Sequence, residues 1–108
     1  YSNEVKTKVL GVKETTLKSF GAVSHETARE MAQGVAELTG ASLAVSTTGI
    51  AGPTGGTPAK PVGLVFFGVY CKGKVKSYRY QFQGDRLLVK EQSAQTALEL
   101  VWRTLREV

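Results

Sequence analysis

The sequence predicts an α/β fold, in which a single compact domain over residues 1–108 forms a three-layer-like arrangement of helices packed on a mixed sheet. Two segments carry apolar residues at helical spacing, His25–Thr39 and 86–107. Strand-like apolar or alternating patterns occupy residues 43–47, 62–71 and 75–83. Lys72-Gly73-Lys74 separates the last two strands and is typical of a hairpin turn.

Cap residues mark the ends of the expected helices. Ser24 is the expected N-cap of the first long helix and Gly40 its C-terminal stop, while Asp85 is the expected N-cap of the last helix. Two shorter helices are expected over residues 1–10 and 12–20, with Ser2 or Asn3 as the first cap and with Gly11 and Gly21 as the stops.

The last helix is expected to cover one face of the sheet. Its predicted buried face consists of Leu87, Ala94, Ala97, Leu98, Val101, Trp102 and Leu105. Tyr78, Tyr80 and Phe82 share one face of the preceding strand. These rings are expected to pack against the last helix rather than to stack on nucleic-acid bases.

A glycine-rich loop separates the first two expected strands. Its glycines permit positive φ and close approach of backbone N–H groups to a ligand, so the loop can cradle an anion. The glycines and prolines of this loop are Gly49, Gly52, Gly55, Gly56, Pro53, Pro58 and Pro61. Neither the P-loop nor the dinucleotide fingerprint fits, because a strand rather than a helix follows. The residues themselves indicate a small anionic or polar ligand.

Composition excludes several classes of function. The net charge of +5 comes from basic residues scattered along the chain, so a solvated basic surface is expected and nucleic acid is not expected as a partner. The single cysteine, Cys71, cannot form an intrachain disulfide, which favours a cytoplasmic setting. No apolar run is long enough to span a membrane. His25, the one histidine, is expected to be solvated, and no metal or other cofactor is expected.

Several blocks of the sequence resemble the CinA C-terminal domain family, the nicotinamide-nucleotide amidases. The resemblance covers essentially the whole chain and lies in residues 1–6, Gly21-Ala22-Val23-Ser24, Thr48-Gly49-Ile50-Ala51-Gly52-Pro53, Gly55-Gly56, Lys60-Pro61-Val62-Gly63 and Gly84-Asp85-Arg86. It implies an enzyme that hydrolyses the carboxamide of nicotinamide mononucleotide to nicotinate mononucleotide and ammonia. A small-molecule nucleotide and a homo-oligomer are the implied partners.

The resemblance also implies roles for individual residues. Lys6 matches the catalytic lysine, and its expected place near a helix N-terminus disfavours its charged form, as a general base requires. Tyr1 is assigned with it to the catalytic group. Five residues match substrate-binding positions, with Arg86 as a phosphate or site-organising contact besides Asn3, Thr48, Gly49 and Gly52.

The chain departs from the family in one respect. The family's nucleophilic serine lies in a Glu-Ser-Cys-Thr-Gly-Gly motif on the first strand–helix junction, and these 108 residues lack that motif. We therefore expect an N-terminally incomplete domain without its first strand and helix, whose exposed sheet edge is covered by an upstream segment or a partner. The alternatives are attack by Thr48, and a non-catalytic domain that binds a nucleotide or a protein.

Overall fold

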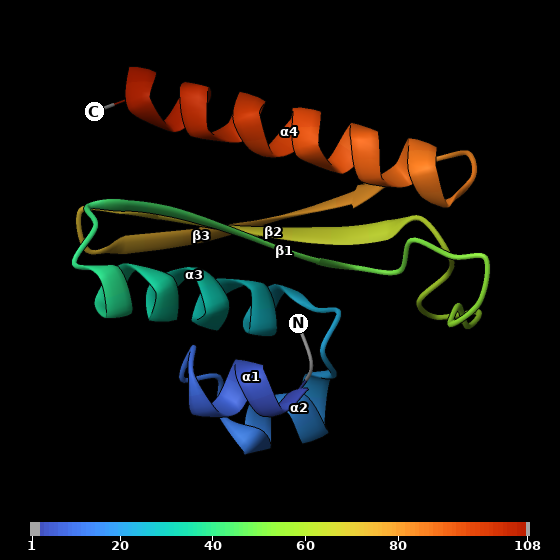
Figure 1. Cartoon of the computed structure of the whole chain (residues 1–108), viewed down its shortest axis with the longest axis horizontal. Helices are drawn as coiled ribbons and strands as arrows, with labels where there is room; N and C mark the ends of the chain where they lie inside the picture. Colours follow the sequence, from blue (N-terminus) through green and yellow to red (C-terminus); the bar gives the residue numbers. More distant parts are fainter. Residues whose placement is uncertain (1–2, 108) are drawn as a thin grey trace.

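The computed structural model describes residues 3–107, which form helices on both sides of a three-stranded sheet (Figure 1). In chain order the elements are α1 (Asn3–Lys8), α2 (Glu14–Phe20), α3 (His25–Thr39), β1 (Leu43–Gly49), β2 (Leu64–Cys71), β3 (Lys74–Gln81) and α4 (Arg86–Arg106). The α/β architecture is confirmed. Ser24 and Asp85 cap α3 and α4 by accepting hydrogen bonds from backbone N–H groups, as predicted.

The sheet is antiparallel throughout the described residues, with strand order β1-β2-β3. The expected mixed sheet is therefore corrected for this part of the chain. The three strands are consecutive, and no helix lies between them to carry the crossover that a parallel pair requires. Strand β2 lies in the centre, and β1 and β3 are the two edges.

The central strand β2 contributes to a hydrophobic core on each face of the sheet. Val65, Phe67 and Val69 pack with Val89 and Leu100 of α4. On the opposite face, Leu64 and Phe66 pack with Ala28 of α3. The layers α3, sheet and α4 can be followed in Figure 1, with α1 and α2 outside α3. The predicted packing of Tyr78, Tyr80 and Phe82 on this α4-side core is confirmed.

Helix α3 lies unusually close to the sheet at one point. A Cβ on Gly68 would lie 2.1 Å from the carbonyl oxygen of Ala28, so only glycine allows this approach. Ser46 of β1 donates a hydrogen bond of 2.6 Å to the same carbonyl. Together these contacts fix the position of α3 across β1 and β2. They therefore also fix where the start of α3 lies relative to the sheet.

The two short helices pack on α3 rather than on the sheet. Leu10 and Val12, in the turn after α1, form a cluster with Met31 of α3. Glu30 of α3 accepts hydrogen bonds from the backbone N–H of Lys13 and from the hydroxyl of Thr16. Helix α1 ends at Lys8, before the predicted stop at Gly11, and Ser2, the other candidate cap, lies outside the described residues.

The predicted buried face of α4 is mostly wrong, although Ala97, one of its members, packs against the core. The buried residues of α4 are Val89, Ser93, Thr96 and Leu100, whereas the large apolar residues of the predicted face, Leu87, Leu98, Trp102 and Leu105, are exposed. Small hydroxyl side chains can face the sheet because the rings of Phe67, Tyr80 and Phe82 fill the space beneath α4. The Ser93 hydroxyl is satisfied by donating to the Val89 carbonyl at 2.7 Å.

No helix within residues 3–107 is both long and apolar enough to cross a membrane. The same part of the chain holds no cluster of three or more histidine, cysteine, aspartate or glutamate side chains that could bind a metal ion.

Candidate active site

The glycine-rich loop leaves the sheet between β1 and β2 and is closed at its base by hydrogen bonds. Gly63 N–H donates to the Ile50 carbonyl at 2.7 Å, and Ile50 N–H donates to the Leu64 carbonyl at 2.9 Å. Gly63 has a φ of +92°, and a Cβ there would lie 2.2 Å from the Phe82 carbonyl oxygen. The loop therefore returns to the sheet along a path that only glycine can follow.

The interior of the loop is folded against its own last turn. A Cβ on Gly52 would lie 2.5 Å from the Val62 side chain, and a Cβ on Gly56 would lie 2.7 Å from the Val62 nitrogen. No hydrogen bond within residues 3–107 uses the backbone N–H groups of Gly55 or Gly56. The loop is thus compact, with backbone donors available to an anion.

Two hydrogen bonds join the loop end of the sheet to the junction between α2 and α3. The Thr48 hydroxyl, which is buried, donates to the Ala22 carbonyl at 2.7 Å. The Lys60 amine donates to the carbonyl of Phe20, the last residue of α2. Thr48 thus lies at the end of β1 as expected, and its hydroxyl hydrogen is used to hold the junction.

Arg86 joins the loop to the start of α4. Its Nη1 donates to the Gly52 carbonyl at 3.0 Å, across 34 positions of sequence. The guanidinium carries five N–H donors, so this hydrogen bond leaves donors for an anionic ligand. The structure therefore brings together Thr48, Gly49, Gly52 and Arg86, four of the predicted site residues, at one end of the sheet.

Lys6 lies in α1 and is buried, with 6% of its surface exposed. Desolvation by burial lowers the pKa of its amine from the ordinary value of 10.5. The predicted cause differs, because α1 is so short that Lys6 lies in its last turn, where the helix dipole favours a cation. The pKa of Lys6 is nevertheless lowered, which is the change that a general base needs. The described hydrogen bonds that hold the loop do not include Lys6.

The remaining two predicted site residues lie at the N-terminal end of the chain. Asn3 is the exposed first residue of α1, and its backbone carbonyl accepts a hydrogen bond from the Thr7 hydroxyl at 3.1 Å. Tyr1 lies outside the described residues.

A cavity of about 320 Å³ opens beside the loop, between β1 and α4. It is lined by Thr47, Gly49, Ala51, Val65, Val89, Lys90, Ser93 and Ala94. Most of these side chains are small or apolar, so the cavity suits a small, partly apolar group.

Sequence reasoning missed several contacts. The expected solvation of His25 is corrected, because its Nδ1 lies 2.8 Å from the Ser77 hydroxyl and its ring packs edge-on against Phe66. Arg29 donates to the same hydroxyl at 2.7 Å. The hydrogen bond from Lys60 to the Phe20 carbonyl was also not predicted, although Lys60 lies in one of the sequence blocks that resemble the CinA family.

The family profile of the CinA C-terminal domain matches residues 1–105. This chain belongs to that family. A putative competence-damage inducible protein of Caldicellulosiruptor saccharolyticus is 56% identical over 105 residues, which cover 97% of this chain and 26% of the relative. A CinA-like protein of Kosmotoga olearia is 55% identical with the same coverage of each chain. The chain therefore spans about a quarter of the length of these CinA relatives.

Solved CinA structures have the same fold. A CinA superfamily protein from Klebsiella pneumoniae superposes with a TM-score of 0.95 at 34% identity, over 100% of this chain and 68% of that one. A competence/damage inducible protein from Agrobacterium tumefaciens gives 0.92 at 40% identity, over 95% of this chain and 64% of that one. The CinA resemblance and the α/β fold are therefore both confirmed.

The fold brings the CinA sequence blocks together in space. Gly21-Ala22-Val23-Ser24, the segment from Thr48 to Gly63 and Gly84-Asp85-Arg86 are far apart in sequence, yet hydrogen bonds connect them at the loop end of the sheet. Side chains and loops gathered in this way are expected at a ligand site rather than in a core.

Proposed function

We propose that this CinA domain belongs to an amidase that hydrolyses the carboxamide of nicotinamide mononucleotide to nicotinate mononucleotide and ammonia. The observation that carries the proposal is the convergence of the CinA blocks on a glycine-rich loop with Arg86 held against it. In this assignment the loop N–H groups and Arg86 bind the nucleotide phosphate.

Lys6 is assigned as the general base. A serine oxygen attacks the carboxamide carbon while the Lys6 amine takes the hydroxyl proton, and the carbon–nitrogen bond then breaks as the leaving nitrogen is protonated to ammonia. Water hydrolyses the resulting acyl ester and regenerates the serine. A buried lysine whose pKa is lowered holds a larger neutral fraction near neutral pH than an exposed lysine, which is why burial supports this role.

The proposal places the nucleophilic serine on a segment outside these 108 residues. An edge strand without charged side chains supports this assignment, since β1 reads Leu-Ala-Val-Ser-Thr-Thr-Gly and pairs on one side only within the described sheet. Unprotected edges of this kind favour pairing with a further strand. The 108-residue chain alone is accordingly expected to release no ammonia. A protein that carries this domain together with the serine segment, here called the parent polypeptide, is expected to release it.

The direct test is ammonia release from nicotinamide mononucleotide by the parent polypeptide, measured for the unchanged protein and for Lys6→Ala. Loss of the base is expected to lower kcat by about 10²- to 10⁴-fold. Lys8→Ala is the matched control, because Lys8 lies on the same helix but is exposed and pairs with Glu4 at 2.8 Å. Its rate is expected to stay within about twofold of the unchanged protein.

The two variants also separate the alternatives. Equal loss in Lys6→Ala and Lys8→Ala would remove the base assignment. A well-folded parent polypeptide that binds the nucleotide and releases no ammonia would instead favour a non-catalytic binding domain, with the loop retained as its ligand site.

A further inference from the structure

Lys60 belongs to a CinA block for which the amidase proposal provides no role. Its side chain crosses from the glycine-rich loop to α2, where the amine donates to the Phe20 carbonyl. Phe20 ends α2, so this carbonyl is among those that no later turn of the helix satisfies. A cation at this end of a helix is also favoured by the negative end of the helix dipole.

The backbone of Lys60 is fixed by a tight turn. Thr57 N–H donates to the Lys60 carbonyl at 2.9 Å, and Lys60 N–H donates to the Thr57 hydroxyl at 3.0 Å. The lysine side chain therefore starts from a defined point in the loop. A hydrogen bond from its amine to α2 restrains the position of the whole turn.

Gly21, next to Phe20, leaves space for the Lys60 amine. Gly21 has a φ of +81°, and a Cβ there would lie 2.7 Å from the Lys60 amine nitrogen. The φ of +81° favours glycine at the residue that follows α2, and the absence of a Cβ leaves room for the Lys60 amine. This contact joins two CinA blocks, one beginning at Gly21 and the other at Lys60.

The loop is consequently held at two points by two cations. Lys60 holds its C-terminal half to α2, and Arg86 holds Gly52 to the start of α4. Between these points lie Gly55 and Gly56, whose N–H groups have no hydrogen-bond partner within residues 3–107. The glycine backbone around these N–H groups can adopt many conformations. Fixing both ends of the segment reduces this conformational freedom before a ligand binds.

We propose that Lys60 is a positioning residue that holds the anion-binding donors of the loop in place through the carbonyl of Phe20. The inference rests on the proposed function for the identity of the anion, the phosphate of a pyridine nucleotide. Lys60 acts on the loop in the ligand-free protein and makes no direct contact with the phosphate, which distinguishes it from Arg86.

The test combines hydrogen exchange and kinetics in the parent polypeptide for Lys60→Met, which keeps the length of the side chain and removes its donor. Without ligand, the amides of Thr57 and Lys60, which are hydrogen-bonded in the turn that carries the lysine, are expected to exchange about tenfold faster, as the loss of one charge-assisted hydrogen bond implies. The KM for nicotinamide mononucleotide is expected to rise about tenfold with kcat within about twofold, and the KM for the phosphate-free riboside to stay unchanged. Lys74→Met, on β3 at the far end of the sheet, is the control and is expected to change none of these.

Unchanged exchange in Lys60→Met would overturn the inference, and a raised KM with unchanged exchange would assign Lys60 to direct phosphate contact instead. Faster exchange with an unchanged KM would limit Lys60 to stabilising the loop and would equally overturn a role in ligand binding. If the unchanged protein releases no ammonia, the amidase proposal fails, while exchange measured with and without nicotinate mononucleotide still decides the role of Lys60.

Discussion

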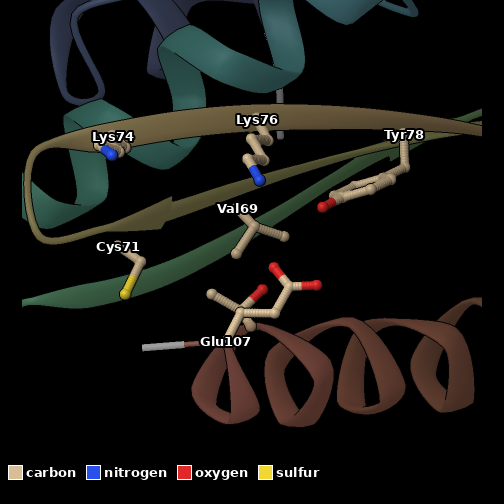
Figure 2. Close-up of a pocket in the computed structure, with 7 residues that line it drawn as sticks. Val69, Cys71, Lys74, Lys76, Tyr78 and Glu107 are labelled. Carbon is tan, nitrogen blue, oxygen red and sulfur yellow. The ribbon is translucent and has the colours of Figure 1, made fainter.

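The two ends of the sheet differ in how they are built. At the loop end, hydrogen bonds from Thr48, Lys60 and Arg86 connect the end of β1 and the long β1–β2 loop to α2, to the junction between α2 and α3, and to α4. At the hairpin end, a short turn joins β2 to β3, and a cavity of about 160 Å³ opens between the sheet and the end of α4. Figure 2 shows Lys76, Tyr78 and Glu107 pointing into this second cavity.

A cavity alone is therefore a weaker sign of function than a loop that long-range hydrogen bonds organise. The lysines at the hairpin end lie near the last turn of α4 and Glu107, where cations favourably offset the helix dipole and a carboxylate. Favourable electrostatic interactions with the end of α4 and with Glu107 therefore explain these lysines without a ligand. At the loop end, by contrast, long-range bonds stabilise a segment that would be costly to order, and this favours a binding site.

The largest expected difference between the two ends concerns glycine. Gly63 and Gly73 have φ of +92° and +84°, but a Cβ on Gly63 would lie 2.2 Å from the Phe82 carbonyl oxygen, whereas one on Gly73 would meet nothing within 4 Å. Gly63→Ala is therefore expected to lower the free energy of unfolding by about 3 kcal/mol and Gly73→Ala by about 1 kcal/mol. Denaturant unfolding of both variants measures the difference, and equal losses would contradict the rigid closure of the loop.

A smaller effect is expected from cutting the contact between α4 and the loop. Arg86→Met removes the donor to the Gly52 carbonyl and one phosphate contact, so kcat/KM for nicotinamide mononucleotide is expected to fall about tenfold or more. Arg103→Met, an exposed residue in the last turn of α4, is the matched control and is expected to retain most activity. If both variants kept full activity, the loop end would lose its assigned role.

The lowered pKa of Lys6 predicts a pH-dependent stability. Because burial lowers this pKa below 10.5, the unfolded chain binds more protons than the folded chain at this residue over the intervening pH range. Stability is therefore expected to rise as pH increases toward 10.5 and to fall as pH decreases through the folded-state pKa. Lys6→Met removes this dependence, so the unchanged protein should gain stability relative to the variant in unfolding curves taken from neutral pH upward. A constant difference would argue against a desolvated amine.

The smallest effect is expected at the hairpin end. Cys71→Ala and Lys76→Met alter the lining of its cavity but touch none of the hydrogen bonds that organise the loop. Both variants are expected to keep kcat and KM within about twofold. A larger loss of ammonia release in either variant would show that the two ends are coupled.

Local signals in the sequence predicted much of the fold but only part of the site. Ser24, Asp85 and Gly40 act within a few residues of their helices, so their roles could be read directly from the sequence. The buried face of α4 could not, since it depends on how the rings of Phe67 and Tyr80 fill the sheet surface. Likewise, the bonds from Arg86 to Gly52 and from Lys60 to Phe20 join positions that are close only after folding.

The most direct test of the account is to map where nicotinate mononucleotide binds on the parent polypeptide by amide chemical-shift changes. The account predicts that the largest changes occur at residues 48–56 and 84–86, beside Arg86 and the glycine-rich loop. Changes centred instead on Cys71, Lys76 and Tyr78 would place the ligand in the hairpin-end cavity and contradict the assignment of the loop end as the active site.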